Sequence, residues 1–490
     1  MPQKPAATES VGGGRRLMGR SLPFSADTAP NSPGDTPARR FLWAAARIMT
    51  VLAMVVVGVK SFFDIFGAKV AADTVDSGMV TTVIGAVFMV GAFVATTVAS
   101  RRFLTNLTPG IVALLLLGLF SVIGLIALPA REDFFQVFAT ANVREIFGPY
   151  IAPRSGIITQ AAQLAVGFAP IVLLAVMFIK PGWFSLDLLR WVLLLVVLGA
   201  VVHSVIAWLQ VAGVVPYTYF FNLMSGKVGR ASGGYFHPAS LGRLLIFAVF
   251  ILYAAGDRLR VSALARYAAV AFLTATAVVS THRITIVCVV FVIVAFELRR
   301  LPELLGQISN LRFRTAVWGA GALVVLVVLA AVRWGAYLFD RAVFLATQIG
   351  SLNPTNDEFL HGRGQIWFRL AEVWRDAPLD IWLLGLAYEP WNTHSDPLRI
   401  FVVWGLLGVI LMAIIFINLW RVTRRAIAVE ARWMLSVLYA VTVISALTQK
   451  PTSYSYFMWM FFLSLMLIVA FYPRVNAPIT PATDTSGDRE

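Results

Sequence analysis

Cysteine and charge are both scarce in this sequence. One of the 490 residues, Cys288, is a cysteine, so an internal disulfide is excluded. Charged residues make up 13% of the chain and hydrophobic residues 59%, and the mean hydropathy of +0.79 excludes an ordinary soluble domain. The strand alternation of an outer-membrane barrel is also absent. The composition therefore predicts an integral membrane protein built from helices.

The charge that is present is mostly basic, with 40 Lys and Arg against 25 Asp and Glu, which gives a net charge of +15. A nucleic-acid partner would require these residues to gather in one patch, and instead they are spread over many short segments. Membrane orientation explains them better than nucleic-acid binding, because basic residues accumulate in the cytoplasmic loops of membrane proteins.

Apolar runs of roughly 20 residues recur along the chain, and a helix needs about this length to cross a hydrocarbon core. Lipid offers no partner to an unpaired backbone amide, so helices are the expected spanning elements. The sequence predicts an all-α polytopic membrane protein with about twelve transmembrane helices. Their centres are expected near residues 52, 88, 119, 168, 202, 247, 274, 290, 324, 409, 440 and 464.

Five regions follow from this pattern. Residues 1–40 and 476–490 lack periodic apolar residues and are expected to form disordered cytoplasmic tails. Residues 41–333 hold spans 1 to 9, and residues 398–475 hold spans 10 to 12. Between them, residues 334–397 form a large periplasmic loop.

The distribution of Arg and Lys predicts the orientation, because these residues fall on alternate sides of successive spans. No cleaved signal peptide is expected. The protein is predicted to lie in the bacterial inner membrane with both termini in the cytoplasm. The basic residues on the cytoplasmic side would be Arg39, Arg40, Arg101, Arg102, Lys180, Arg190, Arg258, Arg260, Arg266, Arg299, Arg300, Arg312, Arg314, Arg421, Arg424, Arg425, Arg432 and Arg474.

The seventh and eighth spans require a tight hairpin with its tip at Ser280–Arg283. One long helix is the competing interpretation, but the alternation of sides holds only with a hairpin.

The large loop contains a predicted amphipathic helix in the stretch "GRGQIWFRLAEVWRDAP". Its apolar residues recur at helical spacing. Tryptophan and leucine on one face with arginine on the other suit the membrane interface. The apolar residues are Ile366, Trp367, Leu370, Val373 and Trp374.

A polar cluster directly precedes the tenth span, in the stretch "WNTHSDPLRIFVVWGLLG". Histidine readily takes a proton near neutral pH. His394 is therefore a candidate general base, with Ser395 and Asp396 as possible orienting partners. In the alternative interpretation, Ser395, Asp396 and Pro397 only start a transmembrane helix, since Ser and Asp cap helices and Pro favours the first turn.

The spacing of His394, Ser395, nine further residues and the "GLLG" of Gly405–Gly408 resembles the O-antigen ligase and O-antigen polymerase superfamily. Three other stretches resemble that superfamily in the same order: "GRASGGYFHPASLGRLL", "STHRIT" and "GRGQIWFRLAEVW". The first departs from the family pattern at His237, Pro238 and Ala239, and the second at Thr281 and His282.

The resemblance implies a membrane glycosyltransferase that moves a glycan from undecaprenyl pyrophosphate to a hydroxyl on a lipid or glycan acceptor at the periplasmic face. His394 would act as the base in an inverting displacement that uses no metal or other cofactor. Arg283, Arg341 and Arg363 would bind the pyrophosphate, because one guanidinium group can donate two parallel hydrogen bonds to two phosphate oxygens. These arginines could instead be interfacial anchors.

Three alternatives remain open. A polymerase of the same superfamily would use the same donor and the same residues, and a protein-glycosylating relative is a further option. A polysaccharide transporter or flippase also has about twelve helices, but such proteins usually place ionisable residues or broken helices near the midplane. The stretch Arg131–Asp133 could hold a metal, although adjacent carboxylates are usually only solvated.

Overall fold

The computed structural model describes residues 36–70, 77–101, 105–131, 152–217, 219, 230–235, 237–307 and 363–474. These residues are predominantly helical, and no β-strand occurs among them apart from one isolated bridge between Ile427 and Pro473. The predicted all-α fold is confirmed.

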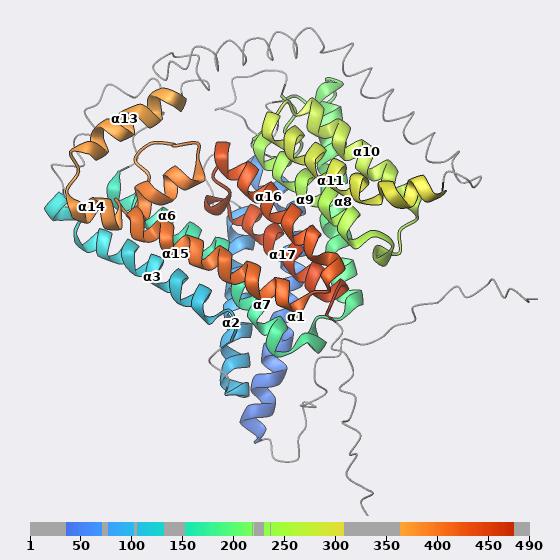
Figure 1. Cartoon of the computed structure of the whole chain (residues 1–490), viewed down its shortest axis with the longest axis horizontal. Helices are drawn as coiled ribbons and strands as arrows, with labels where there is room; N and C mark the ends of the chain where they lie inside the picture. The colour runs from blue at the N-terminus through green and yellow to red at the C-terminus, as the bar shows by residue number, and fades with distance from the viewer. Residues whose placement is uncertain are drawn as a thin grey trace, which may run out of the picture.

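Fourteen α-helices are described (Figure 1). They are α1 (Pro37–Val70), α2 (Ser77–Ser100), α3 (Thr108–Ile126), α6 (Pro153–Phe168), α7 (Pro170–Ile179), α8 (Leu186–Val211), α9 (Pro238–Ala255), α10 (Ala263–Val279), α11 (Arg283–Gln307), α13 (Arg363–Arg375), α14 (Leu379–Leu384), α15 (Asp396–Ala426), α16 (Arg432–Thr448) and α17 (Ser455–Phe471). Short 3₁₀ turns are η1 (Leu128–Arg131), η2 (Pro181–Trp183), η3 (Gly256–Leu259), η5 (Val429–Ala431) and η6 (Pro451–Ser453).

Eight of the described segments are long and apolar enough to cross a membrane, so the chain is a multi-pass membrane protein. The helices α10 and α17 are apolar but shorter, and α11 carries several charged residues. The predicted number of about twelve spans is not reached within the described residues. The predicted span near residue 324, and the large loop up to residue 362, lie outside them.

Two helices, α9 and α17, form the centre of the bundle. All residues of α17 from Phe457 to Phe471 are buried, and so are all those of α9 except Ser240. Since lipid would also suit an apolar helix, it is their burial on every side that shows these two to be surrounded by other helices. By contrast, α3 exposes large apolar side chains such as Leu115 and Ile126, as expected for a lipid-facing helix.

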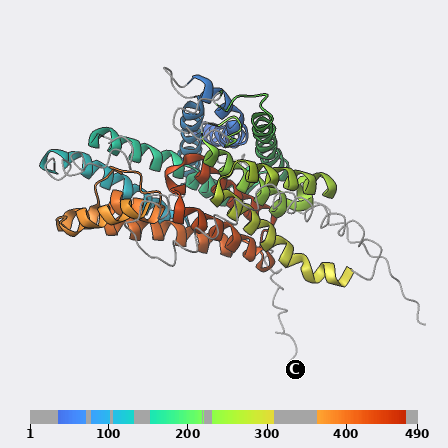
Figure 2. The ribbon, with the colours of Figure 1, turned by 90° about the horizontal axis from the view of Figure 1, so that it is seen from above.

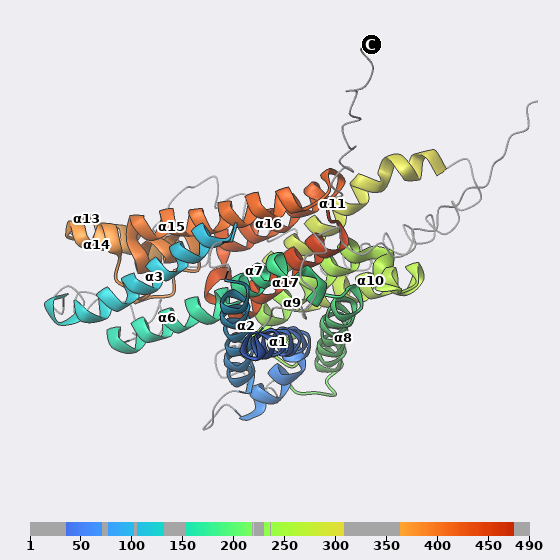
Figure 3. The same cartoon turned by 90° about the horizontal axis from the view of Figure 1, so that it is seen from below.

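The outer helices surround this centre in two groups. Figure 1 shows α17 between α3 and α15 on one side and α8, α10 and α11 on the other. The helices α3, α6 and α15 extend together, with α13 and α14 at their far end (Figures 2 and 3). The prediction of two helices in place of one long helix is confirmed, because α10 and α11 are separate helices joined by a turn at Ser280–His282, in which Thr281 has a φ of 51°. That both helices cross the membrane stays a prediction.

Three of the arginines predicted to lie on the cytoplasmic side, Arg190, Arg258 and Arg474, lie at the same end of the bundle, near the end of α17. Arg190 Nε donates to the Arg258 carbonyl at 2.6 Å. The Arg258 guanidinium carbon lies 3.7 Å from the centre of the Tyr472 ring, and Arg474 N donates to the Ala426 carbonyl. We call this the basic end. That it faces the cytoplasm remains a prediction.

The apolar face of the predicted amphipathic helix, which is α13, packs on protein. Ile366, Leu370 and Trp374 are buried in a small core with Tyr388 and Val402. The interpretation that this face lies on the membrane interface is therefore wrong. The apolar spacing was correctly recognised, but a periodic face does not distinguish lipid from a neighbouring protein segment.

The helix α15 is broken at Gly405, which has a φ of 64° and non-helical geometry. The segment after α14 lies against the break: Leu386 N donates to the Val402 carbonyl at 2.9 Å, and Ala387 N to the Val403 carbonyl at 2.7 Å. Non-helical backbone inside a membrane protein is tolerated where protein satisfies its polar groups. A Cβ on Gly405 would lie 2.4 Å from the Leu383 carbonyl carbon, so glycine is required here.

We expect Gly405→Ala to lower the stability of the protein by about 1–3 kcal/mol, because the side chain would occupy a strained φ and collide with the backbone of residue 383. Thermal unfolding of the purified protein in detergent measures the loss. Gly118→Ala in α3 is the control, since a Cβ there meets nothing within 4 Å. Equal melting temperatures for the two variants would contradict the close approach at the break.

Candidate functional site

A buried group of polar side chains lies where α16 ends and α17 begins. It combines residues of α6, α9 and α15 with two connecting segments. We call it the polar cluster, and it consists of Gln160, Arg243, Glu389, Asp396, Arg399, Lys450, Thr452 and Tyr454.

An ion pair between Asp396 and Arg399 forms the first half of the cluster. The two residues are 2% and 1% exposed, and Arg399 Nε donates to Asp396 Oδ1 at 3.0 Å. Arg399 also donates through Nη1 to Gln160 Oε1 at 2.7 Å and through Nη2 to Thr452 Oγ1. Thr452 binds both oxygens of Asp396, with its amide at 2.9 Å and its hydroxyl at 2.7 Å. Both charges are thus paired and hydrogen-bonded, as burial requires.

The second half of the cluster is organised by Glu389, which is 5% exposed. Lys450 Nζ donates to Glu389 Oε2 at 2.6 Å. The other carboxylate oxygen accepts from the amide of Thr393 at 2.6 Å and from its hydroxyl at 2.9 Å. On the opposite side, Trp367 Nε1 donates to the Thr393 carbonyl at 2.8 Å. The residue immediately before His394 is therefore fixed from two directions.

His394 itself has a strained backbone. Its φ is 52°, in the left-handed region, and its amide donates to the Asn392 side chain at 3.2 Å. The residue is partly buried. Residues other than glycine persist in this region only where their surroundings hold them there, and such residues concentrate at functional sites. The geometry supports the hypothesis that His394 is functional, and its role as a base remains a prediction.

The predicted partners of His394 take other positions. Ser395 is the N-cap of α15 without a side-chain capping bond, and Pro397 lies in the first turn. The interpretation that these residues start a helix is confirmed. Both oxygens of Asp396 are bonded to Arg399 and Thr452. An orienting role for Asp396 or Ser395 stays a prediction.

The predicted arginines are less fully described. Arg283 is the exposed first residue of α11, and Arg363 is the first residue of α13. Arg341 lies outside the described residues. The residue before Arg283 connects its turn to the cluster, because His282 Nε2 lies 3.2 Å from the Gln449 side-chain nitrogen, next to Lys450.

Of the eight residues of the cluster, sequence reasoning named only Asp396 as a site residue, and Arg243 is the most informative of those it missed. Arg243 is 7% exposed on α9, and its guanidinium carbon lies 3.3 Å from the centre of the Tyr454 ring. Its Nε is buried without a hydrogen-bond partner, and no carboxylate among the described residues pairs with it. An arginine within an apolar helix is costly enough to be a signal in itself.

The chemistry of Tyr454 responds to these charges. Burial alone would raise the pKa of its hydroxyl, but the positive charges of Arg243 and Lys450 outweigh burial and hold the pKa below the usual value for tyrosine. The site thus favours a negative charge beside Arg243.

No group of three His, Cys, Asp or Glu side chains gathers in the described ranges to hold a metal. Of the stretch Arg131–Asp133, Arg131 ends η1, and the two carboxylates lie outside the described residues. No protein-family model matches the chain, and no curated protein matches it either. The resemblance to the ligase and polymerase superfamily therefore rests on the motifs.

Replacing Arg399 with Gln is expected to destabilise the protein by about 3–5 kcal/mol, because Asp396 would keep a buried charge without its counterion. Arg369→Gln is the matched control: Arg369 forms an ion pair with Glu372 at the same i,i+3 spacing, but it is 62% exposed. Its loss should cost less than about 1 kcal/mol. Thermal unfolding in detergent compares the two, and similar losses would contradict a structural role for the buried pair.

A titration tests the charge environment of Tyr454. We expect one of the 12 tyrosines to ionise at a lower pH than the others, and phenolate absorbance in ultraviolet difference spectra detects this transition. Tyr454→Phe should remove this transition, and Arg243→Gln should move it to higher pH because one of the two cations is lost. Tyr267→Phe is the control and should leave it in place. A transition that survives Tyr454→Phe would overturn the assignment.

Proposed function

We propose that this protein is a glycosyltransferase of the bacterial inner membrane that moves a glycan from undecaprenyl pyrophosphate to a hydroxyl acceptor at the periplasmic face. The observation that carries the proposal is the unmatched positive charge of the polar cluster. Its three cationic side chains, Arg243, Arg399 and Lys450, face two carboxylates, Glu389 and Asp396. A buried site with one excess positive charge is suited to an anionic ligand.

In this mechanism the acceptor hydroxyl attacks the anomeric carbon while the bond from that carbon to the phosphate oxygen breaks. The pyrophosphate leaves with the bonding electron pair, and His394 takes the proton of the hydroxyl. Configuration at the anomeric carbon inverts. Arg243 and Lys450, together with the expected Arg283, Arg341 and Arg363, stabilise the charge that develops on the leaving group.

The arrangement around His394 supports this role. Lys450 binds Glu389, and Glu389 holds the backbone turn that precedes His394. A continuous series of hydrogen bonds therefore links Lys450, a cation suited to the leaving group, through Glu389 to the turn that carries His394, the proposed base. These bonds limit how far Lys450 and His394 can move relative to each other. Holding reacting groups in a fixed geometry lowers the entropic part of the activation barrier.

A transporter or flippase remains the second candidate, because two features of the described helices favour it. The helix α15 is broken at Gly405, and Lys60 in α1 is 4% exposed and bonded to Asp64 at 2.8 Å. Broken helices and buried charges within spans occur in transporters. A transporter would move lipid-linked glycan without forming a new glycosidic bond, so product analysis separates the two functions.

We expect His394→Ala to reduce glycan transfer by roughly 10²–10⁴-fold while the protein still inserts in the membrane, since one proton-transfer step loses its base. Transfer is measured with a lipid-linked donor and membranes that contain the variant. His237→Asn is the control: His237 caps α9 through its ring nitrogen, and asparagine is also a good cap. Full activity of His394→Ala would contradict the proposed base.

Deletion of the gene distinguishes the members of the superfamily. Lipid A-core without any polymer would indicate a ligase, whereas core carrying single repeat units would indicate a polymerase. Unchanged surface glycan, with no loss of either product, would contradict both.

A further inference from the structure

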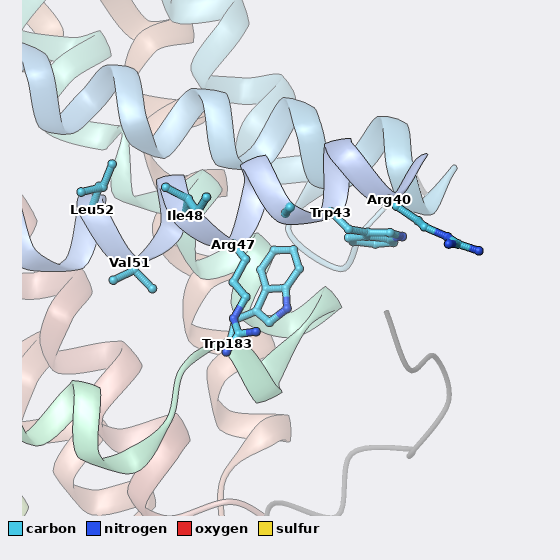
Figure 4. A pocket seen from close by; sticks show the side chains of 8 residues that line it. Arg40, Trp43, Arg47, Ile48, Val51, Leu52 and Trp183 are labelled. Carbon is cyan, nitrogen blue, oxygen red and sulfur yellow. The ribbon is translucent and has the colours of Figure 1, made fainter. Parts of the chain in front are cut away.

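A groove of about 530 Å³ lies at the start of α1, far along the chain from the polar cluster (Figure 4). One side of α1 forms most of it, and the η2 turn closes it. Its main lining residues are Arg40, Trp43, Arg47, Ile48, Val51, Leu52 and Trp183.

The outer part of the groove is cationic and aromatic. Arg40 and Arg47 are exposed, and neither takes part in an ion pair described within residues 36–70 or in the other described ranges. Trp43 and Trp183 contact edge to face, with ring centres 5.7 Å apart. Lys180 adds a third cation, with its Nζ 4.4 Å from the centre of the Trp43 ring. Figure 4 shows Arg47 beside Trp183 and Arg40 at the outer end.

The inner part of the groove is apolar. Ile48 and Leu52, which are 60% and 39% exposed, follow Arg47 along α1 together with Val51. With a rise of 1.5 Å per residue, the groove extends roughly 18 Å from Arg40 to Leu52. The order along the helix is thus cation (Arg40), aromatic ring (Trp43), cation (Arg47) and then aliphatic side chains, over about the length of a headgroup and part of an acyl chain.

We propose that this groove binds one anionic phospholipid. The phosphate lies between Arg40 and Arg47, at the level of Trp43 and Trp183, and an acyl chain follows Ile48, Val51 and Leu52. Charge complementarity favours an anionic headgroup over a zwitterionic one, because each Arg or Lys near a membrane surface strengthens binding to anionic lipid. Tryptophan side chains prefer the headgroup level, where this order places them.

The position in the fold agrees with a lipid site. The η2 turn joins α7 to α8, and Arg190 near the start of α8 contacts Arg258 at the basic end. The groove therefore opens beside other cationic residues and away from the polar cluster. A free phosphate would satisfy the arginines, but it would leave the apolar half without an occupant, so the lipid fits the whole groove.

Native mass spectrometry of the full chain in detergent tests the proposal, with dioleoyl phosphatidylglycerol as the probe. We expect Arg40→Gln/Arg47→Gln to weaken binding roughly 30-fold, or about 5-fold for each arginine. The control is Arg424→Gln/Arg425→Gln, which removes two exposed arginines from the last turn of α15 and should leave the affinity unchanged. Dioleoyl phosphatidylcholine carries no net charge, so it should bind the natural protein and the Arg40→Gln/Arg47→Gln variant with equal affinity.

Location is tested with phosphatidylglycerol that carries bromine in its acyl chains, which quenches nearby tryptophans. Trp183→Phe should reduce the quenching. Four results would overturn the proposal: equal affinity of the natural protein and the Arg40/Arg47 variant, an equal loss in both double variants, binding of inorganic phosphate as tight as that of the lipid, or quenching that is unchanged by Trp183→Phe.

Discussion

The buried ion pair between Asp396 and Arg399 is the interaction on which the polar cluster depends. Taking two charges out of water costs several kcal/mol for each ion, and this cost is offset only where the remaining donors and acceptors are bonded. Gln160 from α6 and Thr452 from η6 supply those bonds. Three segments that are distant in the chain are therefore held together by the need to satisfy one pair of charges.

The same pair also orders the surroundings of His394. Thr452 belongs to the segment that carries Lys450, and Lys450 fixes the carboxylate of Glu389. Glu389 in turn holds the amide and hydroxyl of Thr393. A histidine with positive φ is thus maintained by side chains that are themselves buried and bonded. A strained backbone persists only where the surrounding structure holds it in place. Here the bonds from Glu389 to Thr393 hold the residue next to His394.

The helices could be predicted from the sequence because their signals are local, whereas the contacts between them could not. Apolar runs located the helices, and a Gly-x-x-Gly motif identified Gly405. Nothing local shows that α15 breaks there, because the break depends on the segment near Gly385. The bond from Arg399 to Gln160 joins residues 239 positions apart. Arg243 lies on a helix that is buried on every side, so periodicity cannot indicate which neighbour it faces.

The unmatched charge at Arg243 connects the fold to the proposed chemistry. No carboxylate among the described residues pairs with this guanidinium, which lies against the Tyr454 ring instead. Although burial opposes them, Arg243 and Lys450 together hold the pKa of the Tyr454 hydroxyl below its usual value. The same unmatched positive charge would stabilise the diphosphate of a lipid carrier, the donor in the proposed reaction.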